Sequence, residues 1–177
     1  MLAFDLETTG VDPDACQITC AGVFDPSAGI ERCFVFALGD SPEEFMLLLD
    51  AADRLCGFNA VGFDIHFIER QFRPEPGRVR VWREKLVDVF ESCRLALATT
   101  FSLDQLLEAN GLPCKTGKGS DAVVMASQGR WDELSEYCLM DTRLTHAVSS
   151  MPVIILPKLR TICMFRNARF GTIPCRE

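Results

Sequence analysis

Two acidic residues one position apart stand near the start of the chain, in the run Ala3–Gly10. Residues 1–7 are predicted to form an apolar strand, and because side chains alternate across a strand, Asp5 and Glu7 project from the same face. Two carboxylates held this close resist full ionisation unless a cation lies between them. Since Mg²⁺ and Mn²⁺ prefer oxygen ligands, the pair indicates a divalent-metal site, although a strand end with two solvated acids explains an isolated pair equally well.

A third acid, Asp64, follows a short apolar strand predicted at 55–58 and opens a helix predicted from 64 to about 72. An acid at a helix N-terminus can simply stabilise the helix dipole. Asn59, in the intervening turn, can likewise be an ordinary turn residue. Taken alone, these two residues favour a structural role over a catalytic one.

A fourth acid lies on a long helix predicted from about Asp132 to Ser149. Tyr137 and Asp141 are four residues apart and therefore share one face of that helix. An acid in this position can reach a strand-end site while the helix packs on the sheet, but a surface Asp beside a half-buried Tyr is common for such a pair. The apolar residues that can supply the packing face are Leu134, Cys138, Leu144 and Val148.

The elements that must position these residues indicate a mixed α/β sheet. The order of three strands, helix, strand, helix, strand and further helices favours helices on both faces of the sheet. Residues 1–150 are expected to form the main domain, and residues 151–177 a tail packed on it, in which 153–156 is an edge strand or a partner-binding segment. The other expected strands are 16–24, 30–38 and 86–90, the other helices are 41–54, 102–110 and 121–128, and the loops include 73–77 and 111–119.

Composition restricts the class of protein. The 177 residues carry a net charge of −7, which argues against a non-specific nucleic-acid binder. Nine cysteines without an export signal are expected to be free thiols in a reducing intracellular compartment. Cys16 and Cys20 are four apart, but no second pair completes a zinc set, so no structural zinc is expected. No apolar run is long enough to cross a membrane.

Positive charges crowd two stretches, 70–85 and 158–176. Any single one of these residues is explained as a solvent-exposed surface charge. As two groups, they could instead form a basic rim that binds the phosphates of a nucleic-acid backbone. The run Lys115–Ser120 lacks the spacing of a phosphate-binding P-loop, so nucleoside triphosphate binding is rejected. Lys115 and Lys118 remain candidates for contact with substrate phosphates.

The three motifs in this order resemble the DEDD superfamily of 3′–5′ exonucleases, and specifically its tyrosine subclass, which has an RNase H-like fold. Phe4–Gly10 resembles the first motif, Asn59–Asp64 the second and Tyr137–Asp141 the third. The second is most similar to the proofreading domains of B-family DNA polymerases. The histidine subclass has a His five residues before the last Asp, where this chain has Glu136.

The resemblance implies a two-metal mechanism. Two Mg²⁺ or Mn²⁺ ions would be held by Asp5, Glu7, Asp64 and Asp141, with Asp5 bridging them and Tyr137 orienting the attacking water. The backbone at 6–8 would face the terminal nucleotide, and Leu6 or Phe58 would wedge against a base. The expected substrate-binding residues are Leu6, Thr8, Phe58, Asn59, Lys115 and Lys118.

The sequence therefore predicts a stand-alone exonuclease that releases nucleoside monophosphates from single-stranded 3′ ends, with DNA slightly favoured over RNA. Two alternatives stay open: a catalytically silent nucleic-acid-binding module, and an endonuclease of RNase H or resolvase type. The presence of all four acids and Tyr137 disfavours the first, and Tyr137 four residues before the last acid, together with the Asn59 motif, disfavours the second. A protein partner or a dimer could use the tail at 151–177.

Overall fold

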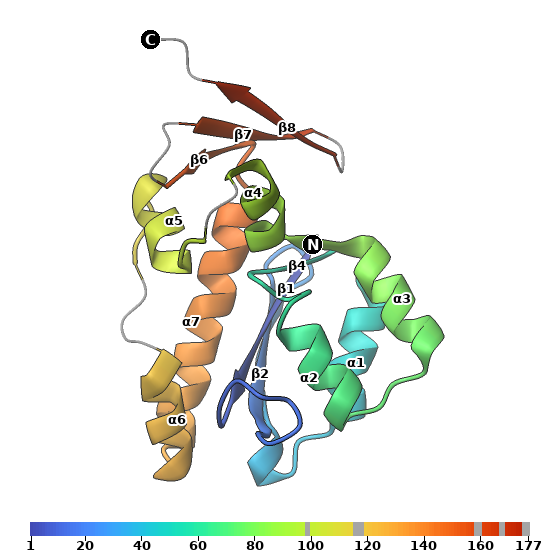
Figure 1. The fold of residues 1–177 in the computed structure, drawn as a ribbon. Helices are drawn as coiled ribbons and strands as arrows, with labels where there is room; N and C mark the ends of the chain where they lie inside the picture. The colour runs from blue at the N-terminus through green and yellow to red at the C-terminus, as the bar shows by residue number, and fades with distance from the viewer. Residues whose placement is uncertain (98–99, 115–118, 158–160, 167–168, 175–177) are drawn as a thin grey trace.

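A computed structural model describes residues 1–97, 100–114, 119–157, 161–166 and 169–174, and it confirms the mixed sheet (Figure 1). Five strands lie in the order β3-β2-β1-β4-β5. The pairs β1–β2 and β2–β3 are antiparallel, whereas β4 pairs parallel with β1 and β5 pairs parallel with β4. The strands are β1 (Leu2–Thr8), β2 (Ile18–Asp25), β3 (Ile30–Val35), β4 (Leu55–Gly57) and β5 (Leu86–Asp88).

The turn and the helix starts that the sequence predicts are present in the structure. The hairpin between β2 and β3 turns at Gly29, whose φ of 67° lies in the left-handed region that glycine adopts without strain. The side chain of Ser41 caps α1 (Pro42–Ala51) by accepting a hydrogen bond from the Glu44 backbone amide. Ser102 and Gln105 form both hydrogen bonds of a capping box at the start of α5 (Leu103–Ala109).

The segment between α2 (Asp64–Gln71) and α5 contains more helix than expected. The loop predicted at 73–77 ends early because α3 (Pro76–Lys85) begins at Pro76, a residue well suited to a first helical turn. The strand predicted at 86–90 stops at Asp88, where α4 (Val89–Leu97) begins. Trp82 is fully buried and hydrogen-bonds to Asp50 of α1, so a distant contact stabilises α3 where its own periodicity is weak.

Helices lie on both sides of the sheet. Figure 1 shows α1, α2 and α3 on one side of β1 and β2, and α7 (Trp131–Ser149) on the other, with α6 (Gly119–Ser127) alongside it. The main hydrophobic cluster includes Phe4, Leu6, Phe34 and Phe45. None of the helices in the described ranges has the length and apolar character that a membrane crossing requires.

The tail forms a second, three-stranded antiparallel sheet of β6 (Val153–Leu156), β7 (Thr161–Arg166) and β8 (Arg169–Pro174). Asn110, at the end of α5, fixes its first strand, because its side chain donates to the Ile155 carbonyl at 2.8 Å and accepts from the Ile155 amide at 2.7 Å. Ile154 and Leu156 are buried in a cluster with α5 and α7. The segment 153–156 is thus a strand, as one of the two expectations had it.

The long helix α7 approaches the sheet closely at Gly22 of β2. A methyl group added at Gly22 would lie 2.5 Å from the Thr142 hydroxyl and 3.0 Å from the Cys138 sulfur. Gly22 is also the cross-strand partner of Asp5. Glycine at this position therefore allows α7 to pack directly over the strand that carries the first acid.

Gly22→Ala is expected to destabilise the protein by about 1–3 kcal/mol, because the helix or the strand must shift to admit the methyl group. Gly77→Ala is the matched control, since it lies in α3 with no neighbouring atom within 4 Å of the added carbon, and it should be neutral or slightly stabilising. Chemical denaturation of the two variants measures the difference. Equal stability of Gly22→Ala and the wild type would show that α7 does not need this close approach.

Candidate active site

Asp5 and Glu7 lie together on β1 with a thiol from α7 beside them. One oxygen of each carboxylate and the Cys138 sulfur lie within 4.8 Å of one another. Directly after Glu7 the pairing of β1 with β2 shifts register, and the Thr19 hydroxyl donates to the Glu7 carbonyl at 2.8 Å. Irregularities of this kind often occur next to functional sites, where they reorient a side chain.

Asp64 reaches the same part of β1 from the first turn of α2. Strand β4 pairs with β1 only at Leu2 and Ala3, and further along the strand the Leu6 amide donates to Asp64 Oδ1 at 2.9 Å. The third acid is thus fixed to the backbone between Asp5 and Glu7. Its side chain is buried, and loss of solvation raises the pKa of Asp64 to about 7, with a further contribution from the charge of Asp88.

Asp88 is a buried acid that the sequence motifs do not reveal. One carboxylate oxygen accepts from the backbone amides of Asn59 and Glu91, and the other accepts from Val61. Burial raises the pKa of Asp88, although these hydrogen bonds favour its charged form. Asp88 therefore holds the turn that leads to Asp64. Its only sequence signal is an acid at the end of an apolar strand.

The helix α7 supplies the remaining predicted residues. Asp141 is buried one turn after Tyr137, and the intervening Cys138 donates to the Asp5 carbonyl with a sulfur–oxygen distance of 3.6 Å. The Tyr137 ring is buried in a cluster with Leu134 and Ala122 of α6. Strand β1 and helix α7 thus meet where Asp5 and Cys138 touch.

The donor set fits hard divalent cations. Asp5 and Glu7 place carboxylate oxygens close together, and Asp64 is buried at a cost that a nearby cation would offset. Such oxygen-rich sites suit Mg²⁺ and Mn²⁺. We therefore keep these acids and Asp141 as the candidate metal ligands.

The expected substrate-binding residues lie in different settings. Leu6 is in the main core, and Phe58 packs against Phe90 and Phe101. Asn59 adopts a φ of 62° in the turn held by Asp88, and the Thr8 hydroxyl donates to the Gly10 carbonyl. Lys115 and Lys118 lie outside the described residues.

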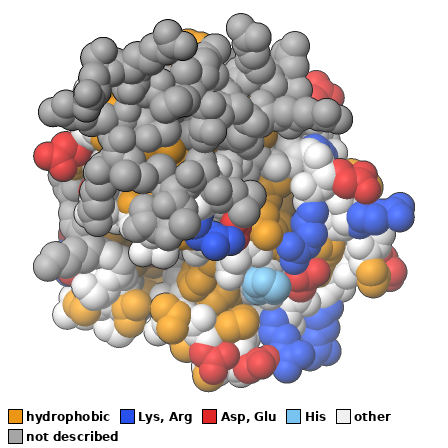
Figure 2. All heavy atoms as spheres, turned by 45° about the horizontal axis from the view of Figure 1, so that its top comes forward, with side chains coloured by type: hydrophobic (Ala, Val, Ile, Leu, Met, Phe, Trp, Pro, Cys, Tyr) orange, Lys and Arg blue, Asp and Glu red, His pale blue; other side chains and the backbone are white. Residues whose placement is uncertain are grey.

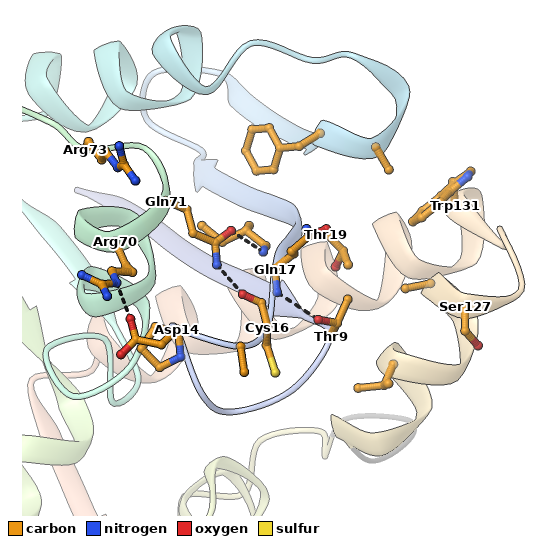
Figure 3. Close-up of a pocket in the computed structure, with 17 residues that line it drawn as sticks. Thr9, Asp14, Cys16, Gln17, Thr19, Arg70, Gln71, Arg73, Ser127 and Trp131 are labelled. Carbon is orange, nitrogen blue, oxygen red and sulfur yellow. Dashed lines mark hydrogen bonds and ion pairs between the residues drawn. The ribbon is translucent and has the colours of Figure 1, made fainter.

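A hollow of about 1080 Å³ opens beyond the end of β1 (Figure 3). Thr9, two residues after Glu7, lies on its wall, and Arg70 and Arg73 lie on the opposite side of the hollow from Trp131. Gln71 fixes the wall by accepting from the Ile18 amide and donating to the Cys16 carbonyl. None of the four candidate acids lines the hollow, so its size alone does not identify it as the reaction site.

The basic residues between 70 and 85 are mostly engaged within the chain. Figure 2 shows basic side chains interspersed with acidic ones on the right of the view, where Figure 1 places α2 and α3. These internal ion pairs favour the solvated-surface explanation over a continuous phosphate-binding rim. The pairs are Arg70 with Asp14, Arg78 with Glu43 and Asp50, Arg80 with Glu84, and Arg83 with Glu69.

Comparisons with known proteins agree with this architecture. A family model described as the RNase H superfamily matches residues 2–151. A family B DNA polymerase from the hyperthermophilic archaeon Pyrobaculum calidifontis shares 20% identity with a TM-score of 0.67, over 84% of this chain and 24% of that one. A nuclease in its apo form shares 20% identity with a TM-score of 0.59, over 82% of this chain and 68% of that one.

A structure of exonuclease I shares 14% identity with a TM-score of 0.51, over 85% of this chain and 43% of that one. The chain thus spans about a quarter of the polymerase and less than half of exonuclease I. At these identities the likeness shows the fold alone. No curated protein sequence gave a match.

Because Asp64 is buried, we expect the stability of the metal-free protein to depend on pH. Its pKa is about 7 in the fold against an ordinary 3.8, so between these values the folded state binds the proton more readily and stability falls as the pH rises. Asp64→Asn keeps an acceptor for the Leu6 amide and removes this cost. In the presence of EDTA, the free energy of unfolding of Asp64→Asn is compared with that of the wild type at pH 5 and at pH 8. The difference should shift in favour of the variant by about 1 kcal/mol or more between the two pH values.

Urea denaturation at the two pH values measures this gain, and Asp53→Asn, at an exposed acid, serves as the control. A difference between Asp64→Asn and the wild type that is the same at both pH values would contradict the assignment.

Asp88→Ala is expected to lower stability by about 1–3 kcal/mol or more, because three backbone amides lose their acceptor at once. Thermal denaturation measures the loss, with Asp53→Ala as the control at an exposed acid. An unchanged melting temperature would mean that the turn before Asp64 is held by other contacts.

Proposed function

The chain belongs to the RNase H superfamily, and from this premise we propose that it is a metal-dependent 3′–5′ exonuclease of the tyrosine subclass. Its substrate is the single-stranded 3′ end of a nucleic acid, with DNA slightly favoured over RNA. The products are nucleoside monophosphates. The closeness of the Asp5 and Glu7 carboxylates, with Asp64 bonded to the backbone between them, carries the proposal.

The proposed mechanism assigns a role to each acid. Asp5, Glu7, Asp64 and Asp141 would hold two divalent ions, which supply an activated water and relieve charge on the leaving oxygen. Asp5 would be one of the ligands on β1, and the Leu6 amide fixes Asp64 beside that strand. Tyr137 orients the attacking water rather than acting as the base, since a phenol with an ordinary pKa near 10 stays protonated at neutral pH.

The hollow beyond β1 offers a path for the strand that leads to the reacting end. Single-stranded nucleic acids are bound through stacking on aromatic rings and through contacts of their phosphates with basic side chains. Trp131 and Arg73 offer these two chemistries on opposite sides of the hollow, which Thr9 also lines.

Asp5→Ala is expected to reduce metal-dependent degradation by roughly 10²–10³-fold or more while leaving the fold intact, because it removes one of the carboxylates that would hold the metal ions. The assay follows single-stranded DNA labelled at its 5′ end, with Mg²⁺ or Mn²⁺, and with EDTA as the metal-free blank. A ladder of progressively shorter labelled products identifies attack from the 3′ end. Asp53→Ala, at an exposed acid, should degrade the strand at the wild-type rate.

The same assay is run with a circular DNA and with an RNA of the same sequence. Circular DNA should stay intact, and its cleavage would establish an endonuclease instead. A wild-type protein that binds the strand but shortens no substrate with either metal would establish the silent binding module.

A further inference from the structure

Three cysteines far apart in the sequence meet beneath α7. The sulfur atoms of Cys20 on β2, Cys33 on β3 and Cys138 on α7 all lie within 4.8 Å of one another. Cys20 and Cys138 are fully buried, whereas Cys33 is half-buried. These residues are free thiols in the structure, and the exonuclease mechanism assigns none of them a role.

The sheet register explains how the three thiols converge. Cys20 and Gly22 are two residues apart on β2 and therefore share one face, and Cys33 is the cross-strand partner of Gly22. Because Gly22 has no side chain, the Cys138 sulfur can occupy the space above it, 3.0 Å from where a methyl group would stand. The thiols of β2 and β3 thus border a gap that the thiol of α7 closes.

We propose that Cys20, Cys33 and Cys138 form a binding site for a thiophilic cation, of which Zn²⁺ is the type that fits best. An ion with Zn–S bonds of about 2.3 Å in tetrahedral geometry holds its sulfur ligands about 3.8 Å apart, which the spacing of these thiols admits. The half-buried Cys33 leaves one side open, so a water molecule can fill the fourth position.

The site is chemically separate from the neighbouring carboxylates. Thiolates select soft cations, whereas the oxygen ligands of Asp5 and Glu7 select Mg²⁺ or Mn²⁺. Cys138 is the point of contact, since its sulfur also lies within 4.8 Å of both carboxylates and donates to the Asp5 carbonyl. A cation on the three thiols would therefore fix α7 to the β2–β3 hairpin immediately beside the acids.

The experiment titrates reduced, metal-free protein with Cd²⁺ in an excess of Mg²⁺, which occupies oxygen ligands and leaves thiols free. Binding is followed by the ultraviolet charge-transfer absorption of thiolate–cadmium bonds, a signal independent of nuclease activity. Wild-type protein should take up one equivalent of Cd²⁺ tightly, and an added excess of Zn²⁺ should displace it.

Cys33→Ser should lose about a third of the absorption and weaken Cd²⁺ binding roughly tenfold or more, because it removes the most accessible of the three ligands. Cys114→Ser is the matched control at an exposed thiol and should titrate as the wild type does. Circular dichroism of both variants without metal establishes that they are folded, and Cys33→Ala replaces Cys33→Ser if the serine variant is not.

Two results would overturn the proposal. One is the absence of charge-transfer absorption when Cd²⁺ equals the protein concentration, which would mean that the thiols serve only as small apolar side chains. The other is a titration of Cys33→Ser that matches Cys114→Ser, which would place the bound ion on other cysteines.

Discussion

The close packing of α7 on β1 and β2 is the constraint on which the site depends. A helix carries Tyr137 and Asp141, and a strand carries Asp5 and Glu7, so neither element can build the site alone. The two meet where Gly22 has no side chain and Cys138 contacts the Asp5 backbone. The missing side chain at Gly22 therefore allows α7 to pack close to the strand that pairs with β1.

Burying carboxylates disfavours their charged form, and hydrogen bonds from backbone amides partly offset this penalty. Asp64 accepts the Leu6 amide, and Asp88 accepts three amides around the turn that precedes Asp64. These contacts fix the carboxylates, but burial still raises the pKa of both groups. Burial thus disfavours the charged form of Asp64, and a divalent cation bound beside this carboxylate would offset that penalty.

Features governed by local rules could be predicted from the sequence, and features governed by distant contacts could not. The alternation of side chains along β1 places Asp5 and Glu7 on one face, and the capping box of Ser102 and Gln105 predicts the start of α5. In contrast, α3 is anchored by Trp82 against α1, and Asp88 acquires its role only when β5 lies next to β4. The metal-binding roles of the four acids remain predictions, since they rest on the order of motifs and on geometry.

The cluster of Cys20, Cys33 and Cys138 is a second feature that depends on distant contacts and could not be predicted from the sequence. Spacing along the chain argued against a zinc site, because Cys16 and Cys20 have no second pair nearby in sequence. The sheet register supplies what spacing lacks, since it brings Cys33 beside Cys20 and α7 adds Cys138. Cys138 then borders both the carboxylates of Asp5 and Glu7 and the thiols of Cys20 and Cys33, which are candidate ligands of two kinds. Because each set selects a different class of cation, the contact that positions the acids also provides a physical route by which a soft metal ion could influence them.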